Sequence, residues 1–266
     1  MPIVIAHGQP KSGSTFLYIT ALEIAALANG EEYYRFRAAR LGEEFQDFRP
    51  TIEPELIHEV AGMIDPEDFI ILKTHNVLTP DLEELIDNGS VLAFTSFRDP
   101  RDTVLSTLDA GKSDREKGST RWFTKFTEAE QLVAPVRRQF ERVVPWIQNR
   151  NVLAIPYYMT AYEQASTVTI LARHLGCGAI CHHLAFEMEV KKSSLPEWNK
   201  GLADRYIDIL DRKDVQFLNQ AFAEVLPVYD GFLRERMGNH NYRLLCAHLI
   251  AERQRRIQSK LDGLEA

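Results

Sequence analysis

The sequence predicts an α/β fold with a central parallel β-sheet flanked by helices. Four short apolar runs have strand character and alternate with longer stretches of helical periodicity. They are IVIA (3–6), FIILK (69–73), VLAFTSF (91–97) and VLAIPYY (152–158). Near-continuous apolar strands separated by helices are typical of a parallel sheet that is covered on both faces. Ligands of such sheets bind at the carboxyl ends of the strands, so the loops after Ala6, Lys73 and Phe97 are expected to converge.

Length and composition indicate one ordinary globular domain. A chain of 266 residues can bury a sizeable core, and we expect residues 1–266 to form a single domain. The hydrophobic fraction is 45% and the charged fraction 26%, as in soluble proteins. A net charge of -7 argues against general nucleic-acid binding.

The cysteines and the apolar segments indicate a cytoplasmic protein. The three cysteines have neither a disulfide framework nor the tight spacing of zinc or redox pairs. The first residues, MPIVIA, lack the basic start and the apolar length of a signal peptide. The longest apolar stretch, residues 16–28, is interrupted by polar residues and is too short to span a membrane. We therefore expect no membrane association.

The sequence also predicts the structure of two further segments. Residues 109–130 are polar, contain two glycines and are expected to form an excursion or lid. The C-terminal stretch is expected to be helical over about 244–262, with an apolar stripe along one side. We favour packing of this stripe on its own domain over packing against a second subunit. A homodimer remains the alternative.

The segment GQPKSGST (8–15) is the first candidate site. It follows a predicted strand and precedes a helix that should begin near Ser14, so its backbone N–H groups would point at an anion. Gly13 would permit a close backbone approach, while Ser12, Ser14 and Thr15 would add hydroxyl donors. A glycine- and serine-rich helix cap without a ligand is the alternative.

The position of the lysine narrows the choice of ligand. A P-loop for nucleoside triphosphates ends in Gly-Lys-Ser/Thr, whereas here Gly13 is followed directly by Ser14, and Lys11 precedes the glycine. No apolar strand ends in a clear metal-binding Asp. The sequence therefore predicts a phosphate compound that is not a magnesium triphosphate.

Two more motifs follow the strands at 69–73 and 91–97. In SFRDPRDTVLS (96–106), Arg98 and Ser106 could bind a second phosphate through a guanidinium fork and a hydroxyl. The alternative is that Arg98 only pairs with an Asp at the helix start. In ILKTHNVL (71–78), Lys73 and His75 share one side of an extended segment, and His75 is a candidate general base.

Together these motifs resemble those of the PAPS-dependent sulfotransferases. PKSGSTF resembles the family's 5′-phosphosulfate loop PKSGTTW, KTH matches its catalytic segment, and FRDPRDTVLS resembles its 3′-phosphate motif RNPRDxxxS. Later segments follow in the same order, with HHLAFEM resembling TSFxxM and KKSSLPEW resembling RKGxxGDW, anchored on Trp198. The resemblance covers about residues 3–200.

The resemblance implies a function and a set of site residues. It implies in-line transfer of a sulfuryl group from 3′-phosphoadenosine 5′-phosphosulfate (PAPS) to a hydroxyl or amine, which leaves adenosine 3′,5′-bisphosphate (PAP). His75 would be the base, Lys11 would meet charge on the bridging oxygen, and Lys73 would steady the transferring group. The implied donor-binding residues are Lys11, Ser12, Gly13, Ser14, Thr15, Phe16, Arg98, Ser106, Tyr157, Phe186, Lys191, Lys192 and Ser193.

The sequence departs from the family's pattern at several of these positions. Phe16 stands where the family has Trp, and Tyr158 stands where it has Glu. The Arg-Lys-Gly of the last loop is Lys191, Lys192 and Ser193, which keeps two charges but loses the bidentate guanidinium fork.

The acceptor and two rival functions stay open. The acceptor is expected to be a small molecule or a glycan with a hydroxyl group. No metal is expected, because the two His and two Glu of HHLAFEME (182–189) have no further ligands at zinc-like spacing. The rivals are a P-loop nucleotide kinase, which would need a lysine beside Ser14, and a non-catalytic binder of PAP, which would not need Lys11, Lys73 and His75.

Overall fold

The computed structural model describes residues 3–178, 184, 188, 201–236 and 240–263. The chain forms two compact units. The first comprises Met1–Phe97 and Glu141–Trp198, and the second comprises Arg98–Phe140 and Asn199–Ala266. The expectation of a single domain over the whole chain stays a prediction.

The first unit is built on a parallel sheet of four strands in the order β2-β1-β3-β4. The strands are β1 (Ile3–His7), β2 (Ile70–Thr74), β3 (Leu92–Phe97) and β4 (Val152–Pro156). The register pairs Ala6 of β1 with Lys73 of β2, and Phe97 of β3 with Pro156 of β4. The predicted α/β class with a central parallel sheet is confirmed.

The prediction for the last strand was too long. Residues Tyr157 and Tyr158 are not in β4 but open the short helix α7 (Tyr157–Tyr162). Pro156 precedes this helix with extended backbone angles, φ -71° and ψ 150°. Proline has no N–H to continue a ladder and is well tolerated at a helix start, so the strand ends there.

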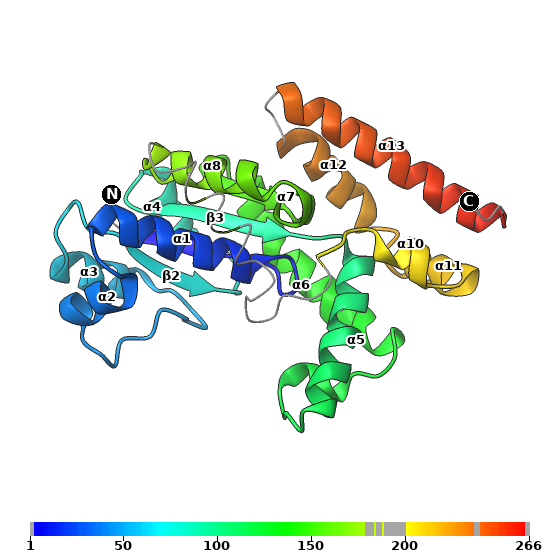
Figure 1. Ribbon diagram of the computed structural model, residues 1–266, viewed down its shortest axis with the longest axis horizontal. Helices are drawn as coiled ribbons and strands as arrows, with labels where there is room; N and C mark the ends of the chain where they lie inside the picture. The colour runs from blue at the N-terminus through cyan, green and yellow to red at the C-terminus, as the bar shows by residue number, and fades with distance from the viewer. Residues whose placement is uncertain (1–2, 179–183, 185–187, 189–200, 237–239, 264–266) are drawn as a thin grey trace. The chain divides into compact units, whose positions relative to one another are not determined.

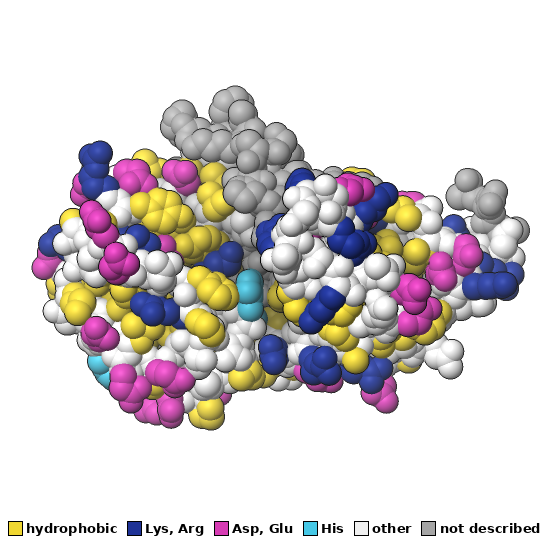
Figure 2. All heavy atoms as spheres, turned by 90° about the horizontal axis from the view of Figure 1, so that it is seen from below, with side chains coloured by type: hydrophobic (Ala, Val, Ile, Leu, Met, Phe, Trp, Pro, Cys, Tyr) yellow, Lys and Arg dark blue, Asp and Glu magenta, His cyan; other side chains and the backbone are white. Residues whose placement is uncertain are grey.

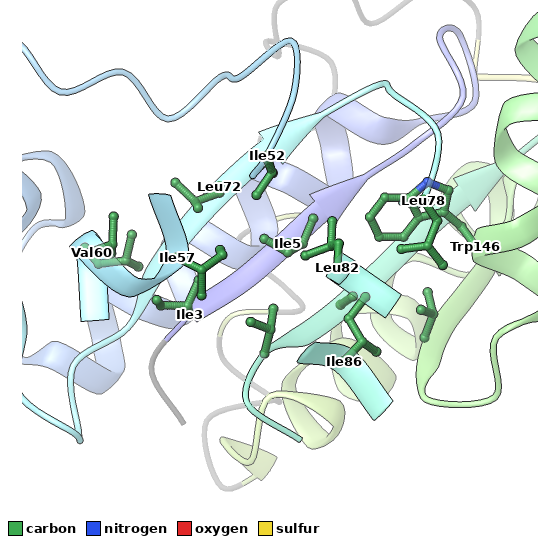
Figure 3. Packing of buried hydrophobic residues seen from close by; sticks show 14 of the residues in the cluster. Ile3, Ile5, Ile52, Ile57, Val60, Leu72, Leu78, Leu82, Ile86 and Trp146 are labelled. Carbon is green, nitrogen blue, oxygen red and sulfur yellow. The ribbon is translucent and has the colours of Figure 1, made fainter. Parts of the chain in front are cut away.

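One face of the sheet is closed by an apolar cluster. Ile3 and Ile5 of β1 point to this face because side chains alternate along a strand. They meet Ile57 from α3 (Pro54–Met63), Leu82 from α4 (Pro80–Asp87) and Trp146 near the end of α6 (Glu130–Gln148). Figure 3 shows these side chains converging on the strands from the covering helices.

Helices α1 (Ser14–Asn29) and α8 (Gln164–His174) cover the opposite face. Figure 1 shows α1 running along the sheet from the loop that follows β1. The adjacent α2 (Tyr33–Leu41) is tied to β2 by Tyr33, whose hydroxyl accepts from the Ile71 N–H at 2.9 Å. Leu72 packs in the cluster on the other face, so Ile71 and Lys73 of β2 lie on the α1 side.

The second unit is helical. It contains α5 (Pro100–Glu116), the 3₁₀ turn η1 (Trp122–Lys125), α10 (Arg205–Ile209), α11 (Arg212–Ala221), α12 (Leu226–Arg236) and α13 (His240–Asp262). Leu105, Tyr206 and Val215 form its buried cluster, and Ile257 and Leu261 of α13 pack against it. Two positions of the predicted apolar stripe, Ile257 and Leu261, thus pack within this unit.

The segment 109–130, expected as an excursion, is partly helical. Helix α5 continues through it to Glu116, and η1 folds back against α5. At Gly111 a Cβ would lie 2.4 Å from the carbonyl oxygen of Phe123, so the close approach requires glycine. The Arg115 guanidinium donates to the Thr124 and Phe126 carbonyls, both at 2.8 Å.

The surface carries both signs of charge. Figure 2 shows acidic and basic side chains interspersed on one face, with hydrophobic side chains exposed between them. Within the described part of the chain, no helix combines the length and hydropathy needed to cross a membrane.

Candidate functional site

The candidate phosphate loop runs from Gly8 to Gly13 between β1 and α1. Helix α1 begins at Ser14, as the sequence predicts, so the first N–H groups of the helix face the loop. Gly13 caps the helix in the left-handed conformation, with φ 84° and ψ 11°. A Cβ at Gly13 would come within 2.5 Å of Thr160 Oγ1 from α7, so glycine is required for two reasons.

Lys11 adopts an unusual backbone conformation. Its φ is 68°, and Asp204 is the other non-glycine residue with positive φ in the described ranges. A left-handed conformation costs a side-chain-bearing residue about 1–2 kcal/mol, and such strain is concentrated at functional sites. The conformation of Lys11 is therefore a candidate functional feature of the loop.

Ser12 stabilises the loop through hydrogen bonds. Its hydroxyl donates to the Gln9 carbonyl and lies 2.6 Å from Ser96 Oγ at the end of β3, and its side chain is fully buried. The Gln9 N–H donates to the Ser96 carbonyl at 2.9 Å. These bonds fix the loop against β3, and donation from the Ser12 hydroxyl to a phosphate stays a prediction. Ser14 and Thr15 are half-buried at the helix start.

His75 is joined directly to the candidate phosphate loop. Its Nδ1 lies 2.6 Å from the Gly8 carbonyl oxygen, and since a carbonyl only accepts, Nδ1 is the donor. In the neutral imidazole the lone pair is then on Nε2, the tautomer that a base acting through Nε2 needs. The half-exposed ring of Phe48 lies 5.7 Å from the His75 ring, centroid to centroid.

Lys73 lies two residues before His75, on the α1 side of β2. Its Nζ sits over the ring of Tyr18, 4.8 Å from the centroid. The phenol in turn donates to Asp47 Oδ2 at 2.9 Å. The sequence-predicted residues of the first unit therefore gather around one end of the sheet, with the loop, Lys73 and His75 at adjacent strands.

A second histidine lies beneath His75 in the core. His7 stacks on Trp146 with ring centroids 4.4 Å apart, and its Nδ1 lies 2.7 Å from Thr95 Oγ1. Burial, with a further contribution from the nearby His75, lowers the pKa of His7 well below its ordinary value of 6.5. His7 is therefore neutral at physiological pH.

The motif 96–106 supplies two candidate residues in the second unit. Arg98 and Ser106 are both buried there, at the start of α5 and two turns along it. Arg98 Nη2 lies 3.4 Å from Asp102 Oδ2 and donates to the Leu202 carbonyl at 2.9 Å. The pairing of Arg98 with an Asp at the helix start, the alternative read from the sequence, is thus present. These contacts involve Arg98 Nη2, and the role of Arg98 in phosphate binding stays a prediction.

The other charges of this motif form a buried ionic network. Asp99 caps α5, and its carboxylate meets Arg101 Nη2 at 2.7 Å and Arg253 Nη2 at 3.1 Å. Burial alone would raise the pKa of Asp99, but the two guanidiniums outweigh it and lower the pKa to about 2. Arg253 of α13 also reaches Asp230 at 3.0 Å, so these residues have structural partners.

The remaining donor-binding candidates divide into two groups. Phe16 and Tyr157 belong to the first unit and are buried, with 2% and 8% of their surface exposed. A role for either ring in binding the donor stays a prediction. The others lie outside the described residues: Phe186, Lys191, Lys192 and Ser193, together with Trp198 of the same segment.

Among the described residues, no group of three or more His, Cys, Asp or Glu side chains could hold a metal ion. The segment 182–189 lies largely outside them.

Comparison with solved structures identifies the fold. A mouse sulfotransferase, SULT7A1, complexed with PAP matches with a TM-score of 0.54 and 15% identity, over 94% of this chain and 88% of that chain. Retinol dehydratase in a complex with retinol and PAP matches with a TM-score of 0.53 and 17% identity, over 84% of this chain and 80% of that chain. The complex of retinol dehydratase with androsterone and the inactive cofactor PAP matches with a TM-score of 0.52 and 13% identity, over 84% of this chain and 80% of that chain. The chain therefore has a sulfotransferase-type fold.

Comparison by sequence adds no relative. No protein-family model matches the chain, and curated protein sequences give no match.

Several residues of the site were not predicted from sequence. Ser96, Thr160, Tyr18 and Asp47 contact the loop or Lys73, but no spacing in the sequence marks them. The one available signal was strand alternation, which places Ser96 on the same face of β3 as Phe94 and hence on the α1 side.

Proposed function

We propose that this protein is a sulfotransferase that moves a sulfuryl group from PAPS to an acceptor hydroxyl. The observation that carries the proposal is the bond between His75 Nδ1 and the Gly8 carbonyl, because it joins a histidine of the required tautomer to a phosphate loop. The sulfotransferase-type fold supports it, and so do the PAP complexes of the solved structures that share this fold.

The proposed reaction is an in-line displacement at sulfur. The acceptor oxygen forms a bond to sulfur as the bond between sulfur and the 5′-phosphate oxygen breaks. The acceptor proton passes to His75 Nε2, and the electron pair of the broken bond stays on the phosphate of PAP. Lys11 would stabilise the charge that grows on this oxygen, and Lys73 would steady the transferring group.

The donor is proposed to bind through both motifs. The loop 11–15 would bind the 5′-phosphosulfate, while Arg98 and Ser106 would bind the 3′-phosphate. The strained Lys11 backbone fits a residue held for a ligand rather than for the fold. The proposed acceptor is a small molecule or a glycan with a hydroxyl group; retinol and androsterone occupy the retinol dehydratase complexes.

Calorimetry with PAP and 5′-AMP tests this assignment. Hydrogen bonds to charged groups contribute about 1.5–3 kcal/mol, so loss of the 3′-phosphate should weaken binding about tenfold or more. In Arg98→Gln, checked for folding by its melting temperature, the preference for PAP should largely disappear. Equal affinity of the wild-type protein for the two nucleotides would remove the 3′-phosphate from the proposal.

A further inference from the structure

The backbone of Lys73 is held on both sides. β2 is an edge strand whose inner neighbour, β1, pairs Ala6 with Lys73. On the outer side, the Lys73 N–H donates to the Asp47 carbonyl and the Arg49 N–H donates to the Lys73 carbonyl, both at 2.8 Å. Phe48 forms an isolated parallel bridge with Lys73. The segment 47–49 therefore fixes the point from which the lysine side chain leaves the sheet.

The lysine side chain is held by a second set of contacts. Its ammonium lies over the Tyr18 ring, 4.8 Å from the centroid, within the range of a cation–π interaction. Tyr18 is one turn into α1, the helix whose start carries the phosphate loop. A long, flexible ammonium side chain is thereby tied to the same rigid element as the loop.

The tyrosine is itself anchored by a buried carboxylate. The Tyr18 hydroxyl donates to Asp47 Oδ2 at 2.9 Å, and Arg37 Nη1 reaches the same oxygen at 3.3 Å. Asp47 is only 6% exposed. Desolvating a carboxylate is unfavourable, and burial raises the pKa of Asp47 despite its hydrogen bond from Tyr18 and its pairing with Arg37.

Tyr18 and Asp47 are better suited to holding the Lys73 side chain in place than to filling the core. A phenylalanine and an apolar residue could fill the same space without the cost of burying a charge. A ring face attracts an ammonium and leaves its positive charge in place. The hydrogen bond to a carboxylate also makes the phenol ring more electron-rich, which strengthens its attraction for the cation.

We propose that Tyr18 and Asp47 are positioning residues for Lys73, with the phenol ring holding the ammonium and the carboxylate holding the ring. The part of this inference that concerns catalysis rests on the proposed sulfuryl transfer. The position of the Lys73 ammonium over the Tyr18 ring does not depend on that reaction.

The first test needs no activity. Lysines of the full chain are reductively methylated with ¹³C, which preserves their charge, and the Lys73 signal is assigned as the one missing from Lys73→Arg. We expect its methyl resonance to be shifted upfield by the Tyr18 ring, and the shift to vanish in Tyr18→Leu. In Asp47→Asn and Tyr18→Phe it should become smaller, because the ring is no longer anchored. A Lys73 signal at the position of exposed lysines would overturn the proposal.

The second test is a double-mutant cycle. Tyr18→Leu should lower kcat about tenfold when Lys73 is present and less than about twofold in a Lys73→Ala background, because the ring acts through the lysine. Equal losses in both backgrounds would mean that Tyr18 is only structural. Tyr33→Phe is the matched control, since it removes a phenol that bonds the β2 backbone at Ile71 but does not touch Lys73. A wild-type protein that transfers no sulfuryl group would refute the proposed function, and the methyl shift would still decide the positioning.

Discussion

The imidazole of His75 and the carbonyl of Gly8 are joined across two strands, with 2.6 Å between Nδ1 and the oxygen. His75 follows β2, and Gly8 follows β1, and these strands are neighbours in a parallel sheet. The carboxyl ends of parallel strands lie at one edge, which is why residues 67 apart in sequence meet there. The bond fixes the ring orientation and the tautomer together.

Loss of this histidine should slow transfer without weakening donor binding. We expect His75→Ala to lower kcat by about 10²–10⁴, the usual range for removal of a general base. The affinity for PAP should be nearly unchanged, because the base acts on the acceptor proton. Steady-state kinetics and calorimetry measure the two quantities, and near-normal turnover of an unactivated alcohol would assign the base elsewhere.

An acidic phenol supplies the control for this variant. Its hydroxyl is already largely ionised, so it should recover part of the activity lost in His75→Ala. The same phenol should not rescue Lys11→Ala, because that lysine is proposed to stabilise the leaving phosphate. Lys11→Ala should also bind PAP more weakly than the wild-type protein. Equal rescue of both variants would contradict the division of roles.

Gly13→Ala should destabilise the first unit and weaken PAP binding. The φ of Gly13 is 84°, and the new Cβ would approach Thr160 Oγ1 to 2.5 Å. Backbone strain and the collision together should cost about 2–4 kcal/mol in the free energy of unfolding. Chemical denaturation measures this cost.

Gly30→Ala is the matched control for Gly13. Gly30 also has positive φ, 70°, but no atom lies within 4 Å of the position of its Cβ. Its substitution should cost only the backbone strain, about 1 kcal/mol, and should leave PAP affinity unchanged. If the two variants lose equal stability, the contact with Thr160 does not constrain the loop.

His7 should make stability depend on pH. Its pKa is lowered in the folded protein, while in the unfolded chain it should be about 6.5. Below that pH the unfolded chain takes up a proton that the folded protein does not. The stability present above pH 6.5 is therefore lost as the pH falls, by at most about 1.4 kcal/mol per pH unit.

Denaturation of His7→Gln at pH 7.5 and 5.5 measures this contribution. The loss of unfolding free energy between the two values should be smaller in the variant than in the wild-type protein. An unchanged dependence in His7→Gln would show that His7 does not titrate on unfolding in this range.

Much of the first unit could be predicted from sequence because its signals are local. Apolar runs mark the four parallel strands, and the glycine and serine run before Ser14 marks the loop and the helix start. The continuation of α5 through residues 109–116 was not predicted, because its polar sequence is stabilised by η1 packing against Gly111.

The contacts that shape the site could not be predicted in the same way. Ser12 bonds Ser96, and Lys73 packs on Tyr18, and each pair joins elements far apart in the chain without a periodic signal. The motif 96–106 was read for its phosphate chemistry, but the sequence alone could not show that Arg253 of α13 would pair with Asp99.

The proposed function is transfer of a sulfuryl group without a metal. The most direct test is incubation with ³⁵S-labelled PAPS and a panel of alcohols, phenols, sugars and amines, in excess chelator. We expect label to move to at least one hydroxyl acceptor, at a rate unchanged by the chelator and strongly reduced in His75→Ala. Absence of transfer to every acceptor, or transfer that requires magnesium, would contradict it.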